Sequence, residues 1–286
     1  MEFALAFALE EMPLVLFTAL APSGTVCMVA LMALLLGHRF ELEYCPRLNQ
    51  AMWLPLAVTT VGLVAAAAHL GTPANALYVF SGVGRSPLSN EVACAVLFLV
   101  VCGVNWLLSF IRNENLQVKR MFAVLIIVLG LVFLASIALA YDVESISTWS
   151  SPFVPANLVL SGCVGGFLLA RLTIVTGLDA GYRPRLLRGL SLASAVALLL
   201  NAAVAAAMWL TLRDVSNAYG SVASLVPMTP LLSAAYLLLA AAGIAMSLRC
   251  GGTLRWEACA VVFVALGLVV VRFGFYMLHM TPGLAM

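Results

Sequence analysis

The sequence predicts an all-α integral membrane protein: a bundle of eight transmembrane helices that forms a single membrane domain over residues 1–286, with both termini outside. Composition gives the first reason. Of the 286 residues, 64% are hydrophobic and only 9% are charged, whereas charged residues make up about a quarter of an ordinary soluble domain. The second reason is that apolar runs of about twenty residues, enough to span a bilayer, recur along nearly the whole sequence. We expect spans near 13–36, 52–70, 91–111, 121–141, 155–176, 186–212, 227–248 and 258–279.

An acidic amino terminus precedes the first span. It carries Glu2, Glu10 and Glu11 and no Lys or Arg, so it lacks the basic segment with which a cleaved signal peptide begins. We therefore expect the first helix to remain in the mature protein. Pro22 and Pro55 are expected to kink the first and second spans.

The second and third spans bring His69 and Glu91 to facing helix ends. The second span ends at Ala-Ala-His-Leu-Gly, which places His69 in the last turn and Gly71 as the stop. The third begins at Pro-Leu-Ser-Asn-Glu, which places Glu91 in the first turn behind a cap at Ser89 or Asn90. Both titratable side chains should therefore lie at one membrane surface. The connection between them is too long for a tight hairpin and predicts a structured lid over a small polar pocket.

Arg171 and Arg272 are basic residues within the predicted spans. Arg171 lies near the cytoplasmic end of the fifth span, where its side chain is expected to snorkel to the surface. Arg272 lies deeper in the eighth span, and Arg272, Tyr276 and His279 follow each other at i, i+4 and i+7 along one helix face. That face ends at the same surface as the histidine and glutamate described above.

The remaining features predict packing and exclude other classes of function. Small residues such as Gly62, Gly162, Gly165 and Gly166 suit close helix packing in lipid, where burial of apolar area does not drive association. The seven cysteines are scattered, with no Cys-x-x-Cys and no Cys/His cluster, so we expect packing roles and no metal site. A net charge of +2 without a basic stripe excludes nucleic acid as a partner.

The distribution of basic residues predicts the orientation. Ten of the 14 Lys and Arg residues fall in the connections after the first, third, fifth and seventh spans: Arg39, Arg47, Arg112, Lys119, Arg120, Arg183, Arg185, Arg188, Arg249 and Arg255. The alternate connections carry most of the acidic residues. By the positive-inside rule, both termini and the ends that carry His69 and Glu91 should face outward.

Glu91 and His69 each also have a purely structural explanation. The helix dipole stabilises a glutamate in a first turn and an imidazole near the last carbonyls. Their joint occurrence favours function, because the sequence has only three histidines and one glutamate within the predicted spans. Ionisable groups are costly to keep at membrane depth.

A carboxylate and a neutral imidazole at the lipid boundary suit the oxidation of a lipid-soluble quinol. A quinol loses two protons together with two electrons, so its hydroxyls need a base and a hydrogen-bond acceptor. The sequence has no nucleotide-binding loop and no cysteines spaced for an iron–sulfur cluster, which makes a partner subunit the expected electron acceptor. We expect no haem, since His69 and His279 are the one conceivable pair of axial ligands.

Five segments resemble the membrane-anchor subunit of bacterial dimethyl sulfoxide reductase. Helix count and length fit this family, and the carboxyl-terminal segment is the most specific part of the resemblance. The segments are Met-Pro-Leu-Val-Leu-Phe-Thr (12–18), Ala-His-Leu-Gly-Thr-Pro (68–73), Leu-Ser-Asn-Glu-Val (88–92), Ser-Thr-Trp (147–149) and Arg-Phe-Gly-Phe-Tyr-Met-Leu-His-Met-Thr-Pro-Gly-Leu-Ala (272–285).

The resemblance implies a haem-free, eight-helix anchor in the bacterial inner membrane that binds and oxidises menaquinol near the outer face during anaerobic respiration. It implies two partners docked outside: an iron–sulfur subunit that receives the electrons and a molybdopterin catalytic subunit that reduces the terminal acceptor. It also implies that Glu91 accepts a proton and that His69 is a hydrogen-bond partner of the quinol. Arg272, Tyr276 and His279 are expected to help hold the quinol.

Two alternatives remain open at this stage. The anchor of a polysulfide-reductase-type complex would differ chiefly in the terminal substrate, and a transporter would need polar groups near the bilayer midplane. One departure from the family pattern concerns Arg272, because relatives often have an acidic residue one turn before this arginine, where the present sequence has Leu268. The departure leaves Arg272 free to reach Glu91 or a carbonyl group.

Overall fold

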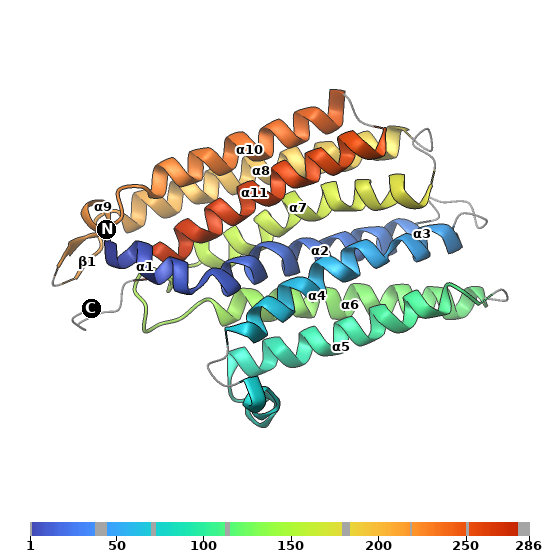
Figure 1. Ribbon diagram of the computed structural model, residues 1–286, viewed down its shortest axis with the longest axis horizontal. Coiled ribbons are helices and arrows are strands. Elements are labelled where there is room, and N and C mark those ends of the chain that lie inside the picture. The colour runs from blue at the N-terminus through green and yellow to red at the C-terminus, as the bar shows by residue number, and fades with distance from the viewer. Residues whose placement is uncertain are drawn as a thin grey trace.

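Eight long apolar helices run back and forth along one axis in the computed structural model, which describes residues 2–37, 45–69, 73–111, 115–178, 184–217, 219–249 and 252–279 (Figure 1). Each is long and apolar enough to cross a membrane. The predicted all-α membrane fold is therefore confirmed. Gly71 and the last residues of the carboxyl-terminal motif, 280–285, lie outside the described residues.

The helices that could cross a membrane are α2 (Met12–Leu36), α3 with α4 (Cys45–Ala51 and Trp53–Ala68), α5 (Pro87–Leu108), α6 (Leu116–Ala140), α7 (Phe153–Gly177), α8 (Pro184–Leu212), α10 (Thr229–Arg249) and α11 (Leu254–Met277). The shorter elements are α1 (Glu2–Glu10), the 3₁₀ helix η2 (Pro73–Gly82), the strands β1 (Ser216–Asn217) and β2 (Gly220–Ser221), and α9 (Val222–Leu225). The two strands pair as an antiparallel hairpin between α8 and α9.

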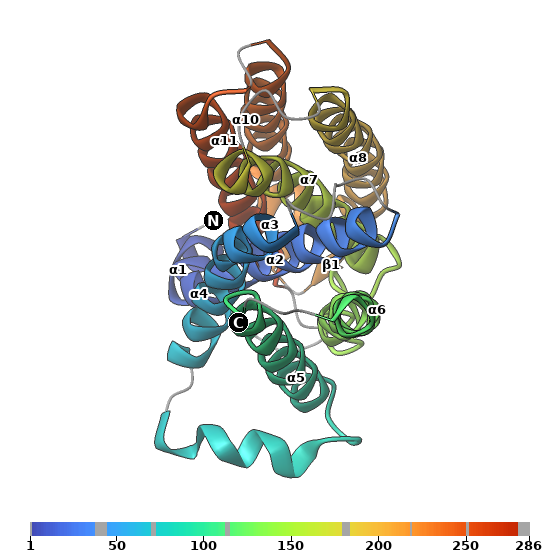
Figure 2. The same cartoon turned by 90° about the vertical axis from the view of Figure 1, so that its right-hand side faces the viewer.

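Helices α2 and α7 form the centre of the bundle. In the view along the bundle they lie in the middle, with α8, α10 and α11 on one side and α4 and α5 on the other (Figure 2). Glycines allow the close contact between them: a Cβ at Gly166 would lie 2.5 Å from Val26 Cβ and 2.9 Å from the Ser23 carbonyl oxygen. Gly162 meets Pro22 in the same way. The predicted packing role of these small residues is confirmed.

Replacing Gly166 by alanine is expected to destabilise the protein by about 1–3 kcal/mol, because α2 and α7 must move apart to make room for the methyl group. Thermal unfolding of the purified protein in detergent measures the effect. Gly103→Ala is the matched control, since a Cβ at Gly103 in α5 meets no atom within 4 Å. Equal unfolding temperatures for the two variants would contradict the packing argument.

The second predicted span consists of two helices in line, α3 and α4. Pro55 lies in the first turn of α4, where a missing backbone N–H costs little. Its carbonyl oxygen accepts a hydrogen bond from the Thr59 hydroxyl at 2.9 Å. The change of helix at Met52, just before Pro55, is the form that the predicted irregularity takes here.

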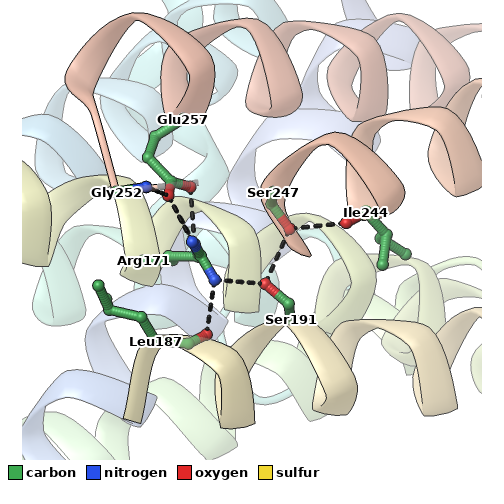
Figure 3. Close-up of polar contacts among 7 residues, drawn as sticks. All are labelled: Arg171, Leu187, Ser191, Ile244, Ser247, Gly252 and Glu257. Carbon is green, nitrogen blue, oxygen red and sulfur yellow. Dashed lines mark hydrogen bonds and ion pairs between the residues drawn. The ribbon is translucent and has the colours of Figure 1, made fainter. Parts of the chain in front are cut away.

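Arg171 does not snorkel to the surface, and that prediction was wrong. Its side chain is 5% exposed, and its Nη2 lies 2.6 Å from Oε1 of Glu257, which is 1% exposed (Figure 3). The same guanidinium donates to the Leu187 carbonyl at 3.0 Å and to the Ser191 hydroxyl at 2.9 Å. Glu257 was expected to lie before the eighth span, but α11 begins at Leu254 and carries Glu257 into the bundle.

The two ends of the bundle differ in what they carry. One end, which we call the α1 end, holds α1, the start of α2, the end of α4, the start of α5, the end of α6, the start of α7 and the end of α11 (Figure 1). The described basic residues of the predicted cytoplasmic connections lie at the opposite end: Arg47, Lys119, Arg120, Arg185, Arg188, Arg249 and Arg255. The orientation of the bundle in the membrane stays a prediction.

Candidate functional site at the α1 end

Glu91 lies one turn deeper in its helix than expected. Ser86, not Ser89 or Asn90, is the N-cap of α5, and its hydroxyl accepts from the Ser89 backbone N–H at 3.5 Å. Asn90 instead accepts from the backbone N–H of Gly84 at 2.7 Å and so fixes the turn that precedes the helix. Glu91 is only 2% exposed, and its Oε1 has no hydrogen-bond partner. A buried carboxyl with an unused oxygen is costly unless a ligand or water completes it.

His69 follows the last residue of α4 and lies at the α1 end, as predicted. Its partner there is not Glu91: His69 Nε2 lies 3.4 Å from Oε2 of Glu11, between α1 and α2. No hydrogen bond or ion pair joins His69 to Glu91 among the residues that the structure describes. Burial raises the pKa of Glu11, His69 opposes this rise, and the neighbouring Glu10 adds to it.

Tyr141, which follows α6, connects these acidic groups. Burial raises the pKa of Tyr141 well above its usual range, and Tyr276, Glu91 and Glu11 add to the rise through their charges. The ring of Tyr276 on α11 meets that of Tyr141 edge-on, with centroids 6.2 Å apart. Both carboxyls therefore act on one buried hydroxyl, which places Glu91, Glu11, Tyr141 and Tyr276 in one cluster with His69. We call these five residues the α1-end cluster.

Aromatic side chains flank the cluster. The imidazole of His279 stacks on Phe7 of α1 at a centroid distance of 4.3 Å and meets Trp149 edge-on at 5.3 Å. Trp149 also stacks on Phe275 at 4.7 Å. Burial lowers the pKa of His279 and so favours its neutral form. Because His279 lies beyond the end of α11, its ring packs against α1 and the α6–α7 connection.

Arg272 of α11 directs its hydrogen bonds to α7. Its Nη2 donates to the carbonyl oxygen of Asn157 at 3.2 Å and to the hydroxyl of Ser161, and its Nε has no partner. Within the described ranges no carboxylate lies at ion-pair distance from this guanidinium. Leu268, one turn earlier, is packed in an apolar cluster and offers no charge. Of the two options that Leu268 left open, Arg272 therefore takes the carbonyl group.

Sequence reasoning did not find Glu11, Phe7 or Tyr141 as members of this region. Glu11 had been noted only as part of an acidic terminus. Its position directly before an expected outer helix start, on the same side as His69, was a usable signal. The described residues contain no group of three His, Cys, Asp or Glu side chains that could hold a metal ion. The side chains gathered at the α1 end can transfer protons and form hydrogen bonds.

Comparison with known proteins places this geometry in a family. The model of the family described as DMSO reductase anchor subunit (DmsC) matches residues 6–278. The protein belongs to this family. One subunit of the anaerobic dimethyl sulfoxide reductase of Escherichia coli (strain K12) is 28% identical over 286 residues, which cover 96% of the present sequence and 97% of that subunit. The Haemophilus influenzae subunit of the same name is 26% identical over 77% of each sequence, and the YnfH subunit of Escherichia coli is 27% identical over 96% and 97%.

As a DMSO reductase anchor subunit, the protein is a multi-pass protein of the bacterial inner membrane and a subunit of an oxidoreductase complex. The predicted family and location are therefore confirmed. The family match includes Glu11, His69, Glu91 and Arg272 and ends one residue before His279. Every member of the α1-end cluster thus lies in the part of the sequence that defines a DMSO reductase anchor subunit.

Proposed function

We infer that this anchor subunit oxidises menaquinol at the α1 end and passes the electrons to an iron–sulfur subunit, which supplies a molybdopterin catalytic subunit that reduces dimethyl sulfoxide. The observation that carries the proposal is the buried, unpartnered Oε1 of Glu91. A quinol hydroxyl is a donor that this oxygen lacks. We place the α1 end outside and both partner subunits on that face, because the basic residues gather at the other end.

The chemistry of the step divides between protein and partner. Oxidation of one quinol to a quinone breaks two O–H bonds and releases two protons and two electrons. The Glu91 carboxylate accepts the proton of one hydroxyl, and the imidazole of His69 accepts a hydrogen bond from the other. The two electrons leave to the iron–sulfur clusters of the partner subunit. No haem in the anchor is needed for this route.

Arg272, Tyr276 and His279 contribute at different distances. Tyr276 is a member of the α1-end cluster and can orient the quinol or Glu91 through its hydroxyl. His279, held between Phe7 and Trp149, contributes to an aromatic wall suited to a flat ring. The direct contacts of Arg272 are on α7, so we propose that it supports the quinol site from behind.

Binding of a fluorescent quinone analogue to membranes that contain the whole complex tests the proposal. Binding is expected to saturate and to be displaced by menaquinone, and His69→Ala is expected to weaken it roughly tenfold, the worth of one hydrogen bond. Tyr219→Phe, an exposed residue of the loop between β1 and β2, is the control and should bind as the wild type does. Unchanged affinity in His69→Ala would count against the site. A Soret absorption band in the purified protein would contradict the haem-free route.

A further inference from the structure

Helix α1, which the sequence did not predict, fixes the position of Glu11. The helix ends at Glu10, and the carbonyl oxygen of Glu11 accepts the backbone N–H groups of Leu14 and Val15, each at 2.9 Å, which begins α2. Ala8 on α1 is fully buried, and Phe7 is stacked on His279. The carboxyl of Glu11 therefore extends from a packed and hydrogen-bonded backbone.

The contact of Glu11 with His69 is incomplete in a way that a proton would complete. The distance of 3.4 Å from Oε2 to Nε2 is an ion-pair distance, and Oε2 is buried with no hydrogen-bond partner. A protonated imidazole carries a donor on both ring nitrogens, so it would give this oxygen a charge-assisted hydrogen bond. Arrival of a proton at His69 thus supplies what Glu11 lacks.

Exposure distinguishes this pair from Glu91. The side chains of His69 and Glu11 are 38% and 15% exposed, whereas Glu91 as a whole is 2% exposed. A proton on Glu91 is enclosed by protein, while a proton on His69 is already at the boundary with solvent. The pair is the natural end of a route from the quinol to water.

We propose that Glu11 and His69 form a carboxylate–imidazole dyad that takes the second quinol proton and releases it to the aqueous surface. The proposal rests on the proposed function and assigns its second proton. Glu91 takes the proton of the first O–H bond, His69 takes that of the second and becomes an imidazolium held by the Glu11 carboxylate, and the two electrons go to the iron–sulfur partner. Glu11 is a positioning residue, because it acts on the quinol only through His69.

The decisive variants are Glu11→Gln, Glu11→Asp and the control Glu10→Gln, which removes the exposed neighbouring carboxyl. A half-exposed ion pair contributes only about 0–1 kcal/mol to stability, so Glu11→Gln should still fold and assemble. Menaquinol-dependent turnover of the whole complex in membranes is measured, together with turnover on a reduced viologen dye that donates to the partner subunits directly. We expect kcat with menaquinol to fall about tenfold in Glu11→Gln, one order less than the smallest typical loss of a general base, with KM little changed.

Glu11→Asp should recover much of the rate, while Glu10→Gln and every dye-driven rate should match the wild type. A merely structural contact predicts no such recovery pattern and no selective change of kcat. A wild-type kcat with menaquinol in Glu11→Gln would overturn the dyad.

The pH profile gives an independent readout. Burial raises the pKa of Glu11, opposed by His69 and supported by Glu10, and Tyr141 is the further titratable group that faces it. As the pH falls through this raised value, Glu11 becomes neutral and no longer holds the imidazolium, so kcat should fall on the acid side above the ordinary glutamate range. Glu11→Gln should lose this acid limb, and Glu10→Gln should keep it.

The outcomes separate the two proposals. Loss of turnover in Glu91→Gln with normal kcat and an unchanged acid limb in Glu11→Gln overturns the dyad alone. Normal turnover in both variants overturns the quinol site and the dyad together. A tenfold fall in Glu11→Gln with loss of the acid limb supports the dyad.

Discussion

Replacing Glu91 by glutamine is expected to lower menaquinol-dependent turnover of the assembled complex by about 100-fold or more, the usual contribution of a general base. Glutamine keeps the shape and the carbonyl oxygen of the side chain but cannot take a proton. The buried position supports a strong effect, because Glu91 is 2% exposed and solvent cannot easily replace it as a base. Its Oε1 has no protein partner whose loss would unfold the helix.

Two further measurements make the Glu91→Gln result decisive. Turnover on reduced viologen should be unchanged, which shows that the partner subunits are present and active. Affinity for a quinone analogue should change less than turnover, because glutamine can still hydrogen-bond. Glu144→Gln is the matched control, since Glu144 is an exposed carboxyl in the α6–α7 connection at the same end. Unchanged menaquinol turnover together with unchanged affinity in Glu91→Gln would defeat the assignment.

Hydrophobicity alone predicted the spans and the shared end of His69 and Glu91. Apolar runs of bilayer length mark the helices, and the observed ends fall within two turns of the predicted ones. Consecutive spans alternate in direction, so the end of α4 and the start of α5 must meet at one end. Details of capping were less predictable: the start of α5 depends on Ser86 and Pro87, which lie before the apolar run.

Long-range pairs could not be predicted, because they depend on distances between segments far apart in the sequence. Glu11 and His69 are separated by the whole of the first span and part of the second, and no sequence pattern links them. Arg171 and Glu257 were hidden for a second reason. A boundary placed at residue 258 left Glu257 in solvent, and without a visible partner Arg171 was assigned to the surface.

Single substitutions in the Arg171–Glu257 pair are expected to destabilise the protein by about 3–5 kcal/mol, because each leaves an uncompensated charge inside the bundle. Arg171 Nε lies 2.8 Å from Oε1 and 2.7 Å from Oε2 of Glu257, and the backbone N–H of Gly252 donates to Oε1 at 2.9 Å. Arg171→Leu abandons this carboxylate, and Glu257→Leu abandons the guanidinium. Thermal unfolding in detergent and the amount of protein retained in membranes report the loss.

The double variant Arg171→Leu with Glu257→Leu should recover most of the stability, since a buried ion pair replaced by apolar residues of similar volume is often neutral. Recovery should be incomplete, because the Leu187 carbonyl loses its donor, although Ser191 keeps its hydrogen bond with Ser247 at 2.8 Å. Arg213→Gln is the control: its contact with Asp214 is exposed, and its loss should change nothing measurable. A double variant no more stable than either single variant would show that Arg171 acts through its carbonyl and serine contacts and not through the charge of Glu257.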